Sequence, residues 1–123
     1  MDDTTLFHYR ARCVRVVDGD TADLVVDVGF HQTATLRLRL LGVDTPEMHA
    51  KDPAERERAV LARQYLIQAL KPGLALPQDW PLRIRTEKSD AFGRWLADIW
   101  LADSGVSVNG ELLKLGHAVE FKR

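Results

Sequence analysis

The sequence predicts a mainly β fold with helices (α+β), because of the order in which its patterns occur. Strand-like alternation or β-branched composition marks residues 7–17, 21–29 and 35–41. A well-marked helix follows, and two further strands are expected at residues 82–87 and 95–101. Three strands, a helix and two strands are the element order of a five-stranded OB-fold barrel, whose helix lies between strands three and four. A mixed sheet with helices on one face is the alternative.

The first three strands are expected to form an antiparallel meander. Asp18-Gly19-Asp20 signals the turn between the first two. Apolar residues then alternate with polar ones, and the apolar positions are Leu24, Val26, Val28, Leu36, Leu38 and Leu40. Since successive side chains of a strand point to opposite faces, these residues should face the core, with Arg37 and Arg39 on the other face.

Capping signals place both helices. Asp52 is the expected N-cap of the first helix, with Pro53 at its first position, and Pro72-Gly73 ends it. Its buried stripe is expected to comprise Ala59, Ala62, Leu66, Ala69 and Leu70. A short second helix is expected at residues 108–115, and residues 118–121 should extend against the barrel.

Composition places the chain among single-domain globular proteins. Its 123 residues, 46% hydrophobic and 28% charged, suit one domain spanning residues 1–123. No apolar stretch is long enough to span a membrane, so no membrane partner is expected. The N-terminus is acidic and polar rather than a signal peptide, which predicts a cytoplasmic protein, secreted only if a leader has been removed. A monomer is the default expectation for the oligomeric state.

Charge and cysteine content narrow the possible functions. Seventeen Lys and Arg against eighteen Asp and Glu give a net charge of −1, which disfavours nucleic-acid binding by bulk electrostatics and calls for a local site instead. The single cysteine, Cys13, allows no internal disulfide and is expected to be a small buried apolar residue. The histidines lack zinc-ligand spacing, no glycine-rich phosphate loop is present, and an EF-hand counted from Asp18 would need a ligand at Ala22.

Acidic residues follow two of the predicted strands. Asp18 and Asp20 come at the end of the first strand, and Asp44 and Glu47 follow the third. A meander brings these two segments together, and converging carboxylates repel one another unless a cation neutralises them. A hard divalent cation does this through carboxylate and main-chain oxygens, so the pattern indicates a metal site.

Each of these fragments, taken alone, also has a structural interpretation. Asp-Gly-Asp is common in turns, where aspartate bonds its own backbone. Arg37 and Arg39 can be solvated strand residues that pair with Asp23 or Asp27 across the sheet, an interaction that stabilises little.

Taken together, the fragments resemble the motifs of one family. Residues 17–21 (VDGDT), 39–47 (RLLGVDTPE) and 90–97 (DAFGRWLA), followed by 108–113 (VNGELL), resemble motifs of the thermonuclease, or staphylococcal-nuclease-like, family in order and separation. The resemblance covers residues 11–121. It implies an OB-fold of calcium-dependent endonucleases that act on DNA and RNA, and therefore a nucleic-acid substrate.

The resemblance also implies a set of metal ligands. Asp20 and Asp44 match the family's side-chain ligands of Ca²⁺, and Thr45 would offer its main-chain carbonyl. Asp18, beside the metal loop, would add negative charge. These are oxygen donors, the ligands that Ca²⁺ prefers.

Catalytic and substrate-binding roles follow in the same way. Glu47 would act as general base or orient the attacking water, while Arg39 and Arg94 would grip the phosphate and stabilise the charge that develops on it. Phe92 stands where the family's best-known member has a tyrosine, and Phe121 is the nearest candidate for a second aromatic contact to substrate. The alternative is a non-catalytic nucleic-acid- or protein-binding module of the same family. Such copies usually lose acidic or arginine positions that this chain keeps.

Overall fold

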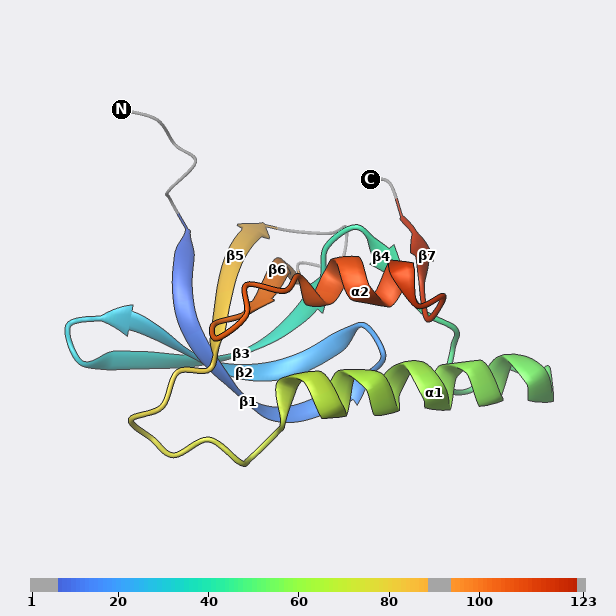
Figure 1. Ribbon diagram of the computed structural model, residues 1–123, viewed down its shortest axis with the longest axis horizontal. Coiled ribbons are helices and arrows are strands. Elements are labelled where there is room, and N and C mark those ends of the chain that lie inside the picture. The colour runs from blue at the N-terminus through green and yellow to red at the C-terminus, as the bar shows by residue number, and fades with distance from the viewer. Residues whose placement is uncertain (1–6, 89–93, 122–123) are drawn as a thin grey trace.

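A computed structural model of the chain describes residues 7–88 and 94–121 and contains a closed five-stranded barrel (Figure 1). The barrel strands are β1 (His8–Asp18), β2 (Thr21–Gly29), β3 (Gln32–Leu40), β5 (Leu82–Lys88) and β6 (Trp95–Leu101). Their order around the barrel is β1-β2-β3-β6-β5, and only the β3–β6 pairing among them is parallel. The predicted α+β OB-fold barrel is confirmed, and so is the antiparallel meander of its first three strands.

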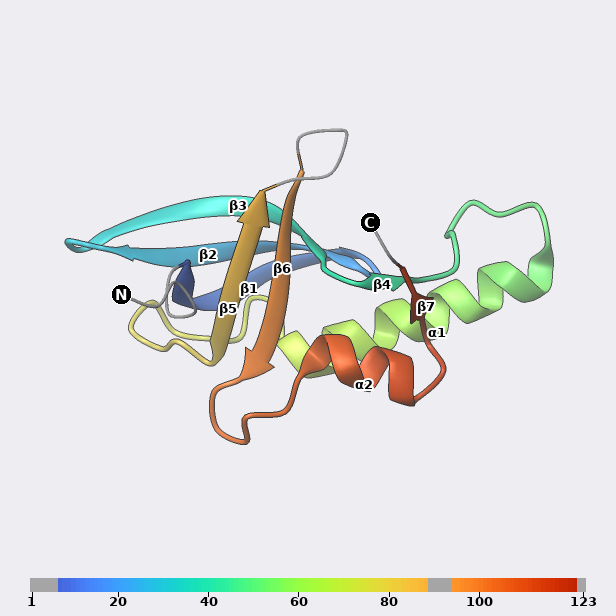
Figure 2. The same cartoon turned by 90° about the horizontal axis from the view of Figure 1, so that it is seen from above.

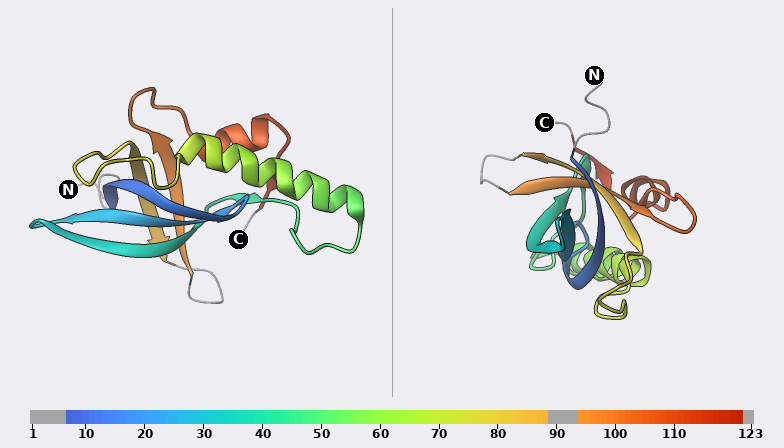
Figure 3. Two further views of the ribbon diagram at one scale, coloured as in Figure 1. Left: turned by 90° about the horizontal axis from the view of Figure 1, so that it is seen from below. Right: turned by 90° about the vertical axis from the view of Figure 1, so that its left-hand side faces the viewer.

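Two helices and a small second sheet complete the fold. Helix α1 (Pro53–Leu70) lies between β3 and β5 in the sequence and runs alongside β1, with its N-terminal half extending beyond the barrel (Figures 2 and 3). Helix α2 (Val108–Lys114) packs on β6. Strands β4 (Val43–Asp44) and β7 (Val119–Glu120) pair with each other, so the chain near residue 119 extends along β4 and not along a barrel strand.

The predicted limits of α1 are confirmed, and local chemistry explains them. The Asp52 side chain accepts a hydrogen bond from the Ala54 amide at 3.0 Å, and Pro53 opens the helix. The helix ends where Lys71 turns left-handed, with φ of 49°. The face toward the barrel buries Ala59, Ala62, Leu66 and Leu70, while Ala69 is half-buried.

The predicted alternation of buried and exposed residues holds except near the tip of the β2–β3 hairpin. Leu24, Val26, Leu38 and Leu40 are buried, as predicted, and Leu36 is half-buried. Val28 was expected to face the core, but it is 42% exposed because β2 there runs into the hairpin tip. The third strand starts at Gln32 instead of residue 35, so this hairpin is longer and its turn tighter than the sequence predicts.

A buried asparagine joins α2 to the barrel. The Asn109 amide nitrogen donates to the carbonyl oxygens of Leu41 at 2.9 Å and Ala97 at 3.0 Å, and its oxygen accepts from the Ile99 amide at 3.0 Å. These bonds satisfy main-chain groups where the parallel β3–β6 pairing ends. Asn109 therefore stabilises the junction from which the chain enters β4.

In the part of the chain that the structure describes, no helix has the length and apolarity needed to cross a membrane.

Cys13 gives a test of the barrel core. The side chain is 2% exposed, and burial raises the pKa of its thiol from the ordinary 9.0 to about 12. Because the thiolate is the reactive form, we expect Ellman's reagent at pH 8 to react slowly with the folded protein and rapidly in urea. The raised pKa also predicts that stability falls as the pH rises from about 9 toward 12, since the unfolded thiol loses its proton first. Equal reaction rates with and without urea would contradict the buried position.

Candidate functional site

One pocket gathers the residues that the sequence analysis singled out. It has a volume of about 320 Å³ and lies at the barrel end where β1 meets β2 and where β3 passes into β4. Its lining consists of Asp18, Asp20, Thr21, Arg39, Asp44, Thr45, Pro46, Glu47, Met48, His49, Arg94 and Phe121. Every predicted site residue is therefore here except Phe92, which lies outside the described residues.

The Arg39 guanidinium lies at the centre of this pocket, between two carboxylates. Its Nη2 is 3.5 Å from Asp20 Oδ2 and 3.2 Å from Asp44 Oδ1, and it is also 3.5 Å from the Val43 carbonyl oxygen. The Arg39 side chain is only 10% exposed. Two converging carboxylates were expected to need a neutralising cation, and in this structure Arg39 supplies that charge.

Asp20 joins the β1–β2 turn to the segment after β3. Its Oδ2 accepts a hydrogen bond from the Thr45 amide at 3.3 Å, and its Oδ1 accepts from the Thr21 hydroxyl at 3.0 Å. Its main-chain carbonyl accepts from the Leu40 amide at 2.8 Å. The predicted meeting of the two acidic segments is therefore confirmed, and Asp20 itself connects them.

Gly19 allows α1 to support both segments. A Cβ atom at this position would lie 2.8 Å from Ala62 Cβ, closer than Cβ atoms approach other atoms, and 3.1 Å from Thr45 Cγ2, which is a tight contact. Only a glycine lets the turn fit between the helix and Thr45. The spacing between Asp20 and Thr45 thus depends on the buried face of α1.

Glu47, Arg94 and Phe121 lie at the rim of the pocket. Glu47 and Arg94 are exposed, and Arg94 directly precedes β6. The Arg39 guanidinium lies over the Phe121 ring, 5.2 Å from its centroid, and the Phe121 amide donates to the Gly42 carbonyl at 2.9 Å. Phe121 therefore reaches the site, as the sequence suggested, with its ring against an arginine.

Arg37 and the neighbouring strand carboxylates lie outside the pocket. Arg37 Nε is 2.8 Å from Asp23 Oδ1, and this hydrogen bond holds the pKa of Asp23 below its ordinary value. Asp27 pairs with Arg10 at 2.7 Å, which lowers the pKa of Asp27 in the same way. The structural interpretation is correct for Arg37, whereas Arg39, on the same strand face, belongs to the site.

The donor set of the pocket suits a hard cation. Among the described residues, no three His, Cys, Asp or Glu side chains are close enough to hold a metal ion by themselves. The groups that converge on the Arg39 guanidinium are the carboxylates of Asp20 and Asp44 and the main-chain carbonyl of Val43, and all three offer oxygen donors. Ca²⁺ binds such sets and completes its shell with water, so the residues present fit it.

Comparison with known proteins agrees with this geometry. A family model described as staphylococcal nuclease homologue matches residues 37–123. The chain belongs to the staphylococcal nuclease family. The match includes Arg39, Asp44, Glu47 and Arg94, while Asp20 precedes it. An uncharacterised protein of Methanocaldococcus jannaschii is 32% identical to this family member over 132 aligned residues, covering 90% of this chain and 58% of the relative. The chain thus spans little more than half the length of that relative.

The contact between Gly19 and α1 predicts a specific mutational coupling. Gly19→Ala should lower the free energy of unfolding by about 1–3 kcal/mol, because the new methyl group overlaps Ala62. Ala62→Gly removes the nearest atom, so the double variant should lose less stability than the two single losses added together. Urea unfolding of all four proteins measures this coupling.

Ala59 provides the matched control for this cycle. It is buried on the same face of α1, so Ala59→Gly has a similar helix cost, but it is not among the atoms nearest to Gly19. Gly19→Ala and Ala59→Gly should therefore be additive. Additivity in both cycles would contradict the proposed contact.

Proposed function

We propose that this protein is a calcium-dependent nuclease that hydrolyses phosphodiester bonds in DNA or RNA. The observation that carries the proposal is the placement of Arg39 between Asp20 and Asp44, in a pocket that Glu47 and Arg94 also line. Two arginines beside several carboxylates suit a reaction in which an anionic phosphate must be held while further negative charge develops on it.

The two arginines would bind the phosphate. A guanidinium presents a planar fork of donors that matches two phosphate oxygens, which the point charge of lysine cannot do. Arg39 approaches from β3 and Arg94 from the start of β6, so the pair brackets the pocket from two adjacent strands. Binding a phosphate would give Arg39 an anionic partner in addition to its carboxylates.

Asp20, Asp44 and the main-chain carbonyl of Thr45 would hold the calcium ion, with Asp18 adding negative charge nearby. When bound, such an ion orients water and phosphate and offsets negative charge on the phosphate. The hydrogen bonds of Asp20 to Thr21 and Thr45 orient its carboxylate before any ligand arrives.

Glu47 would act as the general base. Its carboxylate accepts a proton from a water molecule as the water oxygen forms a bond to phosphorus. The bond from phosphorus to the leaving oxygen breaks, that oxygen takes up a proton from solvent, and Glu47 returns the proton it accepted to solvent. The exposed position of Glu47 at the pocket rim gives it access to water. Phe92 and Phe121 would contact the bases or sugars of the substrate, through stacking alone since neither carries a hydroxyl.

Cleavage assays test the proposal directly. Purified protein should cut single-stranded DNA or RNA in calcium and should stop cutting when a chelator is added. Glu47→Gln, purified in parallel, controls for contaminating nucleases and should be inactive. Cutting by the wild type that is equal in chelator and in calcium would contradict metal dependence. Binding without cutting would support the non-catalytic alternative.

The arginine assignment makes a second prediction. Arg39→Lys and Arg94→Lys keep the charge but lose the fork, so each should lower kcat by about 100-fold or more, as expected for a lost transition-state donor. Arg37→Lys is the matched control, since Arg37 lies on the same face of β3 but pairs with Asp23. It should leave kcat unchanged. A similar loss in Arg39→Lys and in Arg37→Lys would mean that β3 as a whole, and not the fork of Arg39, is needed.

A further inference from the structure

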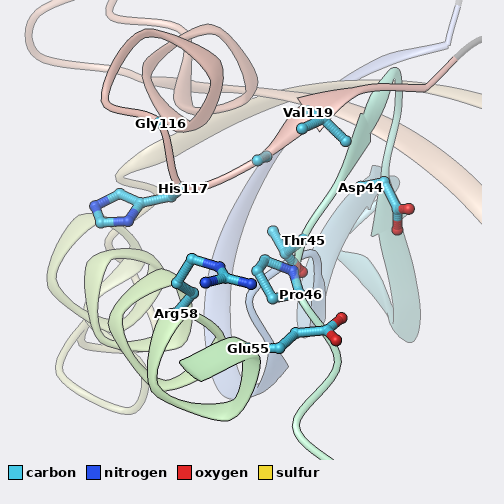
Figure 4. A pocket seen from close by; sticks show the side chains of 9 residues that line it. Asp44, Thr45, Pro46, Glu55, Arg58, Gly116, His117 and Val119 are labelled. Carbon is cyan, nitrogen blue, oxygen red and sulfur yellow. The ribbon is translucent and has the colours of Figure 1, made fainter. Parts of the chain in front are cut away.

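A second pocket lies directly beside the candidate site. It has a volume of about 380 Å³ and is bounded by α1, β4 and the segment that leads into β7 (Figure 4). Its walls include Glu55, Arg58 and His117, and it shares Asp44, Thr45 and Pro46 with the first pocket. The segment at residues 44–46 is thus a common wall, and a chain molecule that crosses it would contact both pockets. We call this second cavity the flanking pocket.

Arg58 presents its charge toward the shared wall. Figure 4 shows its guanidinium extending toward Pro46. Glu55 lies one helical turn earlier, where it would ordinarily pair with Arg58, yet no ion pair joins these two described residues. By contrast, the nearby Arg56 donates to the carbonyl oxygens of Ala50 and Lys51 at 2.7 and 3.0 Å. Arg56 therefore has a structural role, and Arg58 is oriented toward the pocket.

The rear wall of the flanking pocket is flatter and less polar. The imidazole of His117 stacks on the Tyr65 ring, with centroids 5.5 Å apart and planes 26° from parallel, and Val119 also lines the pocket. This stacking holds the imidazole in place. The lining holds one arginine and one imidazole beside the carboxylates of Asp44 and Glu55, and a pocket of this kind suits a small ligand that has both a charged and a flat part.

We propose that the flanking pocket binds the nucleotide next to the scissile phosphate, with Arg58 contacting that nucleotide's own phosphate and His117 its sugar or base. The proposal rests on the proposed nuclease function, because the ligand is the same nucleic-acid strand continuing past Asp44 and Pro46. Glu55 opposes this binding by charge, so Arg58 and Glu55 should influence affinity in opposite directions.

Binding of single-stranded DNA tests the proposal. A labelled eight-nucleotide strand is titrated, by fluorescence anisotropy, with variants made in the Glu47→Gln background with calcium present, so that no cleavage interferes. Arg58→Gln should weaken binding about tenfold, the effect of losing one charge-assisted contact to phosphate. The slope of log K against log salt should become shallower by about 0.7, as for one lost phosphate contact to a single strand. Arg58→Lys should keep most of the affinity, and Glu55→Gln should increase it.

Two controls separate this effect from a general loss of charge. Arg83→Gln removes one positive charge from β5, in neither pocket, and should not change affinity. A dinucleotide with a single phosphodiester lacks the neighbouring phosphate that Arg58 would contact, so Arg58→Gln should not change its binding. The NMR signals of the His117 imidazole should shift when the eight-nucleotide strand binds, and unchanged signals would contradict the proposed contact.

The outcomes distinguish this inference from the nuclease proposal. If the wild type cleaves nucleic acid but Arg58→Gln behaves like Arg83→Gln, the flanking pocket is overturned and the nuclease function stands. If the wild type does not cleave but its affinity depends on Arg58, the pocket stands and catalysis is overturned. A protein that binds no strand at all overturns both.

Discussion

The buried guanidinium of Arg39 constrains the whole end of the barrel on which the site is built. A cation that is nearly excluded from water is stable only where anions and acceptors surround it. Asp20 comes from the β1–β2 turn, Asp44 from β4, and the ring of Phe121 from the C-terminal segment, so three separate parts of the chain meet at this one group. The contacts of Arg39 and Asp20 that hold the site are therefore also contacts that hold the fold, so replacing either residue carries a cost in stability.

Features set by neighbouring residues were predictable from the sequence, and features set by distant contacts were not. The start of α1 follows from Asp52 and Pro53, because capping is a local interaction. The alternation of apolar and polar residues predicts which side of β2 and β3 faces the core, because this pattern is also local. The partner of β7 could not be read in this way, because a two-residue strand carries no periodic signal and pairs only with what lies beside it. Val28 breaks the pattern because it lies near the tip of the β2–β3 hairpin, where it is 42% exposed.

In the candidate site, too, local features were predictable from the sequence and features set by distant contacts were not. The approach of Asp20 to Asp44 was predictable, since a meander must bring a turn and a strand end together. Strand alternation makes Arg37 and Arg39 equivalent, and only the later segments that cover Arg39 distinguish them. No role for Asn109 was predicted from the sequence. A polar residue between the apolar positions Val108 and Leu112 nevertheless indicates a side chain that forms hydrogen bonds with buried main-chain groups. Arg58 has no such signal, because charged residues are ordinary on a helix surface.

The barrel closes through the parallel pairing of β3 with β6, and this closure completes the site as the chain is made. Asp20, Arg39 and Asp44 precede Arg94 and Phe121 in the sequence, so they leave a ribosome earlier. Leu38 pairs with Trp95 across a long intervening stretch, so the barrel closes only after β6 has been made. A nascent chain that stops before β6 carries the carboxylates and one arginine but lacks the second. Any chemistry that requires both arginines is thereby withheld from unfinished protein.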